Sequence, residues 1–321
     1  MNKRERVIAS IKKEKADFVP TCFSLHFNRI NKTQEEDLES HLEFFRETDV
    51  DISKIMNENL LPDFGPIVTA EDWKIIPAFD KNSIFIKNQI ELTKRILSHL
   101  QREDFSIGTL HGICASSIHP IEARYGYELV RALQVKHFRE NKDSVLDAFK
   151  RITDGLIELV RQYASTGLDG IYYAALGGEE RYFSDEEFEE AIAVFDKAIL
   201  KEIKENGLYS FLHICKDSLK MERYKSYAGY FDVVNWGIYE APCSIEKMKK
   251  IFPEACIMGG LANRSGVIVD GSIEELEQEV ERLIKTYGKE GFILGADCTL
   301  PTEIPYSRIK SIVDTCRKTI S

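Results

Sequence analysis

The chain has 321 residues, of which 43% are hydrophobic and 30% are charged, and its formal net charge is −10 at pH 7. This balance is that of an ordinary globular protein, and the negative charge excludes non-specific nucleic-acid binding, which needs a basic surface. No apolar run is long enough to span a bilayer, so we expect no membrane insertion.

The cysteine content indicates the compartment. The seven cysteines are an odd number, scattered without the spacing of a disulfide framework, which is typical of a reducing environment. The charged N-terminus is not followed by an apolar segment, so no signal peptide is predicted. We therefore expect a cytoplasmic protein.

The first half of the sequence predicts two helices, three strands and one long insertion. Residues 2–13 form an amphipathic helix, and a second helix is expected over 34–47. Strands are predicted at 19–24, 50–56 and 105–110. The intervening residues 57–104 are too long for a simple connection, with a strand expected near 73–76 and a helix near 90–100. We interpret them as an insertion over the mouth of a barrel.

The second half of the chain alternates regularly between strands and helices. Strands are predicted at 171–176, 209–215, 231–236, 255–260 and 292–296. Long helices are expected over 142–166, 216–229 and 305–319. Two further helices begin with capping boxes, in which a Ser is followed three residues later by a Glu, at Ser184 and at Ser272.

Eight alternations of strand and helix predict the fold. They indicate parallel βαβ units, and eight such units close most simply into a barrel. We predict a (β/α)8 TIM barrel with an extra N-terminal helix and an insertion between strands 2 and 3, with residues 1–321 as a single domain. No Gly-x-Gly-x-x-Gly motif follows the first strand, which weakens a dinucleotide-binding alternative.

Three side chains near the ends of two strands predict a metal site. His213 and Cys215 are two residues apart, so a strand directs both to one face, and Cys298 follows the last strand. Functional groups of such barrels collect at the C-terminal ends of the strands. Two thiolates and one imidazole are the donors of a three-ligand zinc site whose fourth position is open. We predict His213, Cys215 and Cys298 as metal ligands and catalytic residues.

Five other residues are candidates for substrate binding. His26 and Arg29 follow the first strand and could meet an anionic substrate. Tyr172 lies on the fourth strand, and Asn235 and Trp236 end the sixth, where one of the two must face the barrel mouth. For each of them, a solvated or packed side chain is the competing interpretation.

Short motifs distributed along the chain resemble one family. They are Asn2 to Ile8 with Asp17-Phe18-Val19-Pro20, Ser184 to Phe188, Met258-Gly259-Gly260-Leu261-Ala262, and Gly291 to Cys298 with Pro301 and Pro305. In this order they resemble the uroporphyrinogen decarboxylase superfamily. The resemblance extends over nearly the whole chain.

Two branches of that superfamily imply different chemistry. The methylcobamide:coenzyme M methyltransferases and related corrinoid-dependent methyltransferases carry His-x-Cys and a distant Cys as zinc ligands, which His213, Cys215 and Cys298 match. Their further Glu ligand near strand six has no counterpart, because Asn235 and Trp236 occupy that region. The decarboxylases need no metal and carry an Arg-rich loop after strand one, whereas residues 23–30 contain one Arg.

The resemblance implies a zinc-dependent methyltransferase that moves a methyl group between a corrinoid (methylcobalamin) protein and a small thiol or other heteroatom substrate. Its cofactors would be zinc and a corrinoid bound to the partner protein. A homodimer is compatible with this interpretation, whereas nucleic-acid and membrane partners are not expected. The alternatives are a uroporphyrinogen decarboxylase, which removes porphyrinogen carboxylates, and a non-catalytic accessory barrel with a closed zinc site.

Overall fold

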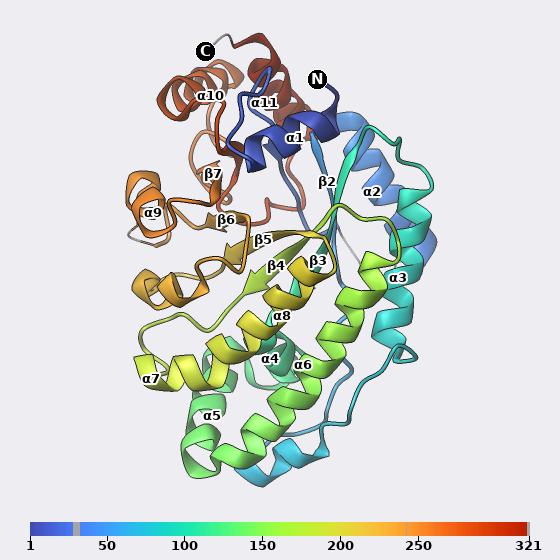
Figure 1. Cartoon of the computed structure of the whole chain (residues 1–321), viewed down its shortest axis with the longest axis vertical. Coiled ribbons are helices and arrows are strands. Elements are labelled where there is room, and N and C mark those ends of the chain that lie inside the picture. The colour runs from blue at the N-terminus through green and yellow to red at the C-terminus, as the bar shows by residue number, and fades with distance from the viewer. Residues whose placement is uncertain (28–32, 242, 320–321) are drawn as a thin grey trace.

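Eight parallel strands form a nearly closed barrel in the computed structural model, which describes residues 1–27, 33–241 and 243–319 (Figure 1). The strands are β1 (Thr21–Cys22), β2 (Ile52–Ile55), β3 (Phe105–His111), β4 (Gly170–Ala175), β5 (Tyr209–Ile214), β6 (Val233–Trp236), β7 (Cys256–Leu261) and β8 (Phe292–Ala296). Their order around the sheet is β1-β8-β7-β6-β5-β4-β3-β2, and every pairing is parallel. The predicted (β/α)8 TIM barrel is confirmed.

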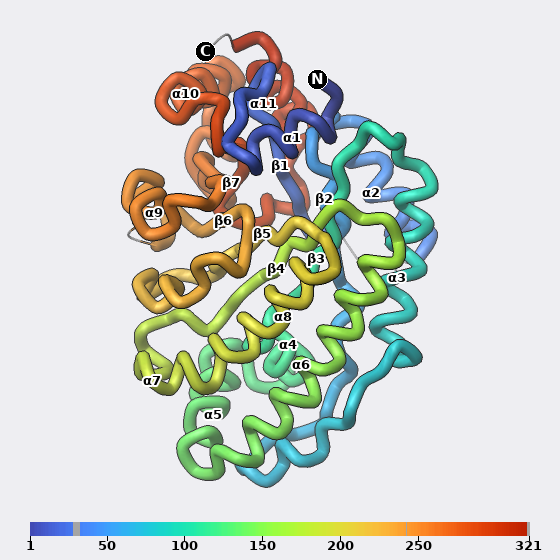
Figure 2. The backbone as a smooth tube through the Cα atoms, in the orientation of Figure 1, coloured from blue at the N-terminus to red at the C-terminus, as the bar shows by residue number. Residues whose placement is uncertain are grey.

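Helices surround the barrel on its outside. They are α1 (Lys3–Ile11), α2 (Gln34–Thr48), η1 (Ala70–Ile75), α3 (Ile84–Leu97), α4 (Ile113–Tyr125), α5 (Tyr127–Glu140), α6 (Lys142–Ala164), α7 (Asp185–Phe188), η2 (Glu189–Ala193), α8 (Val194–Glu205), η3 (Met221–Tyr227), α9 (Ile245–Ile251), α10 (Ile273–Tyr287) and α11 (Tyr306–Lys318). The insertion between β2 and β3 contains η1 and α3 and follows the lower and right edges of the view in Figure 2. No helix in the described part of the chain is both long and apolar enough to cross a membrane.

Side chains bridge the seam where β1 and β2 are not paired. The backbone N–H and the hydroxyl of Thr21 both donate to Oδ2 of Asp51, at 2.9 and 2.8 Å. The other carboxylate oxygen of Asp51 accepts from Nη1 of Arg6 at 2.7 Å. All three residues are buried, so this network closes the barrel and ties α1 to it.

The alternation of side chains along each strand separates the barrel interior from the layer under the helices. Phe211 and His213 of β5 face the interior, whereas Leu212 and Ile214 pack under the helices. Val7 and Ile11 of α1 pack with the apolar interior residues, so the N-terminal helix covers one end of the barrel. Polar side chains therefore collect at the opposite end, where the strands finish.

Two local predictions were wrong, and one helix was not predicted. Residues near Trp73 form the 3-10 helix η1 and not a strand, because the Trp73 indole is buried against Phe149 and donates to Nδ1 of His137 at 3.2 Å. The segment after β5 forms only the short 3-10 helix η3. The helix α4 was not predicted, because its Pro120 and its small polar residues obscure the apolar period.

Candidate metal centre and cavity

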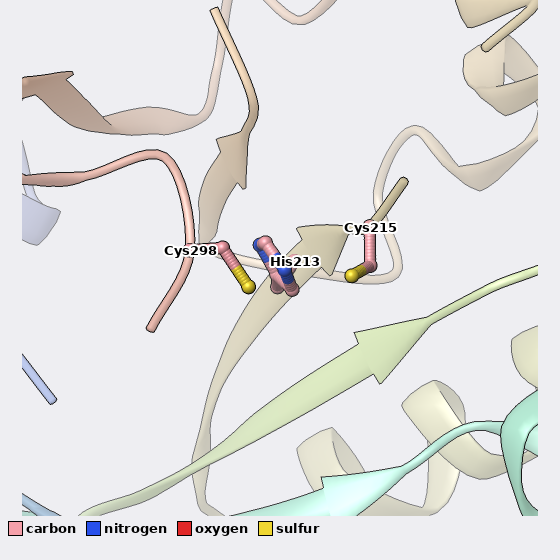
Figure 3. Close-up of side chains that lie close together, drawn as sticks. All are labelled: His213, Cys215 and Cys298. Atoms are coloured by element: carbon pink, nitrogen blue, oxygen red, sulfur yellow. The ribbon is translucent and has the colours of Figure 1, made fainter. Parts of the chain in front are cut away.

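The barrel brings His213, Cys215 and Cys298 together. His213 lies in β5, Cys215 directly follows that strand, and Cys298 follows β8 by two residues. Their ligand atoms all lie within 4.8 Å of one another, and Figure 3 shows the three side chains converging (Figure 3). Because β6 and β7 lie between β5 and β8 in the sheet, only the curvature of the barrel makes this meeting possible.

Hydrogen bonds at Asn235 determine which nitrogen of His213 faces the cluster. The Asn235 side-chain N–H group donates to the carbonyls of Met258 at 3.0 Å and Ala296 at 3.1 Å, so its oxygen must accept. That oxygen lies 2.6 Å from Nδ1 of His213 and also accepts from the Tyr172 hydroxyl at 2.9 Å. Nδ1 therefore carries the proton, and Nε2 keeps a free lone pair.

The free nitrogen lacks a hydrogen-bond partner among the residues that the structure describes. Nε2 of His213 is buried, and no described residue forms a hydrogen bond with it. An unpaired buried polar atom is costly, and a metal ion would remove this cost. The donor set of one imidazole and two thiols fits zinc, so His213, Cys215 and Cys298 could hold it.

The two thiols do not titrate alike. A hydrogen bond from Cys215 lowers the pKa of Cys298 well below that of an ordinary thiol, and the nearby His213 lowers it further. The same hydrogen bond, together with burial, raises the pKa of Cys215. Sharing one proton in this way makes the pair a ready source of thiolate for a metal.

The cluster contains three protein donors among the described residues. Within 1–27, 33–241 and 243–319, no fourth His, Cys, Asp or Glu brings a ligand atom into this group. Glu240 follows β6 and is exposed, and it does not join the cluster. The donor set is therefore that of a site with an open coordination position.

A cavity of about 640 Å³ lies over the three donors and is large enough for a small molecule. Its lining includes apolar side chains from several elements, namely Met56, Leu60, Ala123, Ala174 and Leu176. Polar and charged side chains complete the wall. The cluster therefore faces a pocket with both apolar and polar walls.

The predicted substrate-binding residues lie in different places. His26 is on the cavity rim beside Glu58, with 48% of its side chain exposed, and Tyr172 is in the wall. Asn235 is buried beneath His213 and does not line the cavity. Trp236 faces the helices, where its indole N–H donates to the carbonyl of a loop residue at 2.9 Å. Arg29 lies outside the described residues.

Lys54 was missed by the sequence analysis. This β2 residue is 5% exposed and lines the cavity, with its Nζ 3.4 Å from the centroid of the Tyr172 ring. The same ring stacks on His213 with a centroid distance of 5.3 Å. Burial lowers the pKa of Lys54 to about 8. A lysine inside a short apolar strand was the only indication that the sequence offered.

Two neutral imidazoles form another wall of the cavity. His111 ends β3 and His119 lies on α4, with ring centroids 5.1 Å apart. Burial is the main cause that lowers the pKa of His111 to about 3 and that of His119 to about 4. Both are therefore uncharged at neutral pH and can serve as hydrogen-bonding groups for a ligand.

The fold and the donor cluster define a TIM-barrel protein with a candidate metal centre at the C-terminal ends of its strands. The model of the uroporphyrinogen decarboxylase family matches residues 52–319, and the chain belongs to that family. A search among curated proteins finds no match.

The similarity to solved structures extends over nearly the whole chain. A methyltransferase from Methanosarcina mazei has a TM-score of 0.74 at 13% identity, covering 98% of this chain and 98% of that chain. A B12-independent methionine synthase from Shewanella sp. W3-18-1 has a TM-score of 0.57 at 11% identity, with 94% of each chain covered. At these identities the similarity is one of fold.

Proposed function

We propose that the chain is a zinc-dependent methyltransferase that moves a methyl group between a corrinoid on a partner protein and a small thiol or other heteroatom substrate. The observation that carries this proposal is the convergence of His213, Cys215 and Cys298 under a cavity, without a fourth protein donor among the described residues. Structural zinc sites are closed by four protein ligands, whereas catalytic ones keep a position for substrate.

The residues of the chain would divide the work between them. When bound, zinc would lower the pKa of a thiol at the open position, so that the substrate is a thiolate at neutral pH. His213, Cys215 and Cys298 would hold the ion, and Asn235 keeps His213 in the tautomer that presents Nε2. The apolar part of the cavity wall would exclude water from the methyl group in transit.

The neighbours in fold support methyl transfer in general. One is a methyltransferase and the other a methionine synthase, and both are similar to this chain over at least 94% of its length. The second is named as independent of vitamin B12, so the corrinoid part of the proposal depends on the sequence resemblance. In this proposal the corrinoid is bound to a partner protein, as the sequence resemblance implies.

Two alternatives make different demands on the same site. Porphyrinogen decarboxylation would use no metal and would leave the unpartnered Nε2 of His213 and the two adjacent thiols without a role. An accessory barrel with structural zinc would need a fourth protein ligand, which the described residues do not supply.

The test combines metal analysis with a transfer assay. Purified protein is analysed for zinc and then assayed with methylcobalamin and a panel of thiols, before and after removal of the metal by a chelator and again after zinc is restored. We expect stoichiometric zinc and thiol methylation that disappears and returns with the metal. Methylation that survives chelation, or turnover of uroporphyrinogen by the stripped protein, would contradict the proposal.

A further inference from the structure

Lys54 is a buried cation that forms no salt bridge with a carboxylate in the described part of the chain. It is 5% exposed and contributes to the cavity wall. Its Nζ donates to the Ser24 hydroxyl at 3.1 Å and lies over the Tyr172 ring. No carboxylate of residues 1–27, 33–241 or 243–319 forms a salt bridge with it. This is unusual, because buried charges are normally paired.

The ammonium group retains hydrogen-bonding capacity toward the cavity. A protonated lysine has three N–H donors, and Ser24 accepts one while the Tyr172 ring face attracts the charge. Neither partner neutralises the charge. Burial lowers the pKa of Lys54 only to about 8, so the cation predominates at neutral pH. An anion entering the cavity would therefore gain a desolvated, charge-assisted hydrogen bond.

Lys54 lies close to the candidate metal ligands. The ring of Tyr172 contacts both the Lys54 ammonium and the imidazole of His213. Burial has the largest effect on the pKa of Lys54 and lowers it, whereas four nearby groups act electrostatically to raise it, namely Cys22, Cys298, Cys215 and Glu58. Two thiolates would already balance the double charge of a zinc ion, so the three-donor centre would not need this further cation.

We propose that the substrate carries a fixed anionic group, such as a carboxylate, and that Lys54 binds this group while the heteroatom of the substrate reaches the cluster of His213, Cys215 and Cys298. This inference rests on the proposed function, since it identifies the substrate class of the same site. Lys54 is then a specificity-determining residue: it selects anionic over neutral molecules of equal size.

The experiment compares thiol acids with thiol alcohols of the same length. The pairs are mercaptoacetate with 2-mercaptoethanol, 3-mercaptopropionate with 3-mercapto-1-propanol, and 4-mercaptobutyrate with 4-mercapto-1-butanol. Each is assayed as methyl acceptor from methylcobalamin with the zinc-loaded protein, and kcat/KM is recorded. At the length that fits, we expect the acid to exceed its alcohol by about 10- to 100-fold, as for a hydrogen bond between charged groups.

Variants then assign the preference to one residue. Lys54→Met keeps the length of the side chain and removes its charge, and should abolish the preference for the acid, because kcat/KM for the acid falls to the level of the alcohol. Lys54→Arg should retain part of the preference. Lys216→Met removes a second lysine of the described cavity wall, whose Nζ lies 3.7 Å from the Tyr127 ring centroid, and should leave the acid-to-alcohol ratio intact. Thermal unfolding shows that each variant is folded.

Several results would overturn the inference. One is equal kcat/KM for acids and alcohols in the wild type at every length. Another is a preference for the acid that persists in Lys54→Met. A third is a loss of zinc from that variant, which would assign Lys54 to the metal centre. If no thiol is methylated at all, the proposed function fails. The anion site is then tested by binding the same pairs to Co(II)-substituted protein, whose visible spectrum reports thiolate coordination, and equal affinities would overturn it.

Discussion

Replacing Asn235 by Ala should weaken zinc binding while leaving all three metal ligands in place. The variant removes the acceptor that lies 2.6 Å from Nδ1 of His213, so the imidazole loses the contact that fixes its tautomer and its plane. Loss of such a supporting hydrogen bond typically costs 10- to 100-fold in metal affinity, or about 1.4 to 2.8 kcal/mol. The buried carbonyls of Met258 and Ala296 also lose their donor, so the free energy of unfolding should fall by about 2 to 4 kcal/mol.

Competition with a chromophoric chelator measures the zinc affinity, and urea unfolding measures stability separately. Tyr172→Phe is the matched control, because it removes the hydroxyl that donates to the same Asn235 oxygen at 2.9 Å and leaves the bond to His213 intact. That control should lose stability but keep its zinc affinity within about threefold. A folded Asn235→Ala protein that binds zinc as tightly as the wild type would refute the reasoning.

Three further predictions concern the same end of the barrel. Cys298→Ala should lose stoichiometric zinc, whereas Cys316→Ala, which changes a thiol buried on α11, should keep it. Zinc analysis of the two purified variants tests this, and equal zinc content in both would contradict the ligand assignment. Zinc binding near pH 7 should release a single proton from the thiol pair, because the pKa of Cys298 is lowered and that of Cys215 is raised. Calorimetry in buffers of different ionisation enthalpy measures the number of protons released, and release of two protons would contradict the prediction. As pH falls from 6.5 towards 4, the free energy of unfolding should decrease, because His111 and His119 take up protons in the unfolded chain but not in the folded one. Urea unfolding at a series of pH values should show a weaker pH dependence of this free energy in the His111→Asn/His119→Asn variant. An unchanged pH dependence would contradict the depressed pKa values.

The barrel was predictable because its local patterns agree with its topology. The capping boxes at Ser184 and Ser272 both begin helices, and the eight predicted strands overlap those observed. The short segments were less predictable. Burial of Trp73 outweighed the strand propensity of its segment. Pro120 obscured the pattern of the helix α4, whose apolar face is recognised only from its packing in the folded structure.

The candidate site was predictable only in part. Proximity of His213 and Cys215 follows from strand alternation, and that of Cys298 from closure of the barrel. The place of Asn235 beneath His213 depends on the register of β5 against β6, which pairs these two residues and is not encoded by either strand alone. The proposed role of Lys54 depends on the absence of a salt bridge to it among the described residues, and this is a property of the folded cavity.

The central claim is that three protein donors hold a zinc ion whose remaining position takes the substrate. X-ray absorption at the zinc edge, recorded on zinc-loaded protein without and with a thiol substrate, tests it most directly. We predict two sulfur atoms at about 2.3 Å, one imidazole nitrogen and one light atom, with a third sulfur replacing the light atom when the thiol is added. A coordination shell of four protein donors that does not change with thiol would contradict the account.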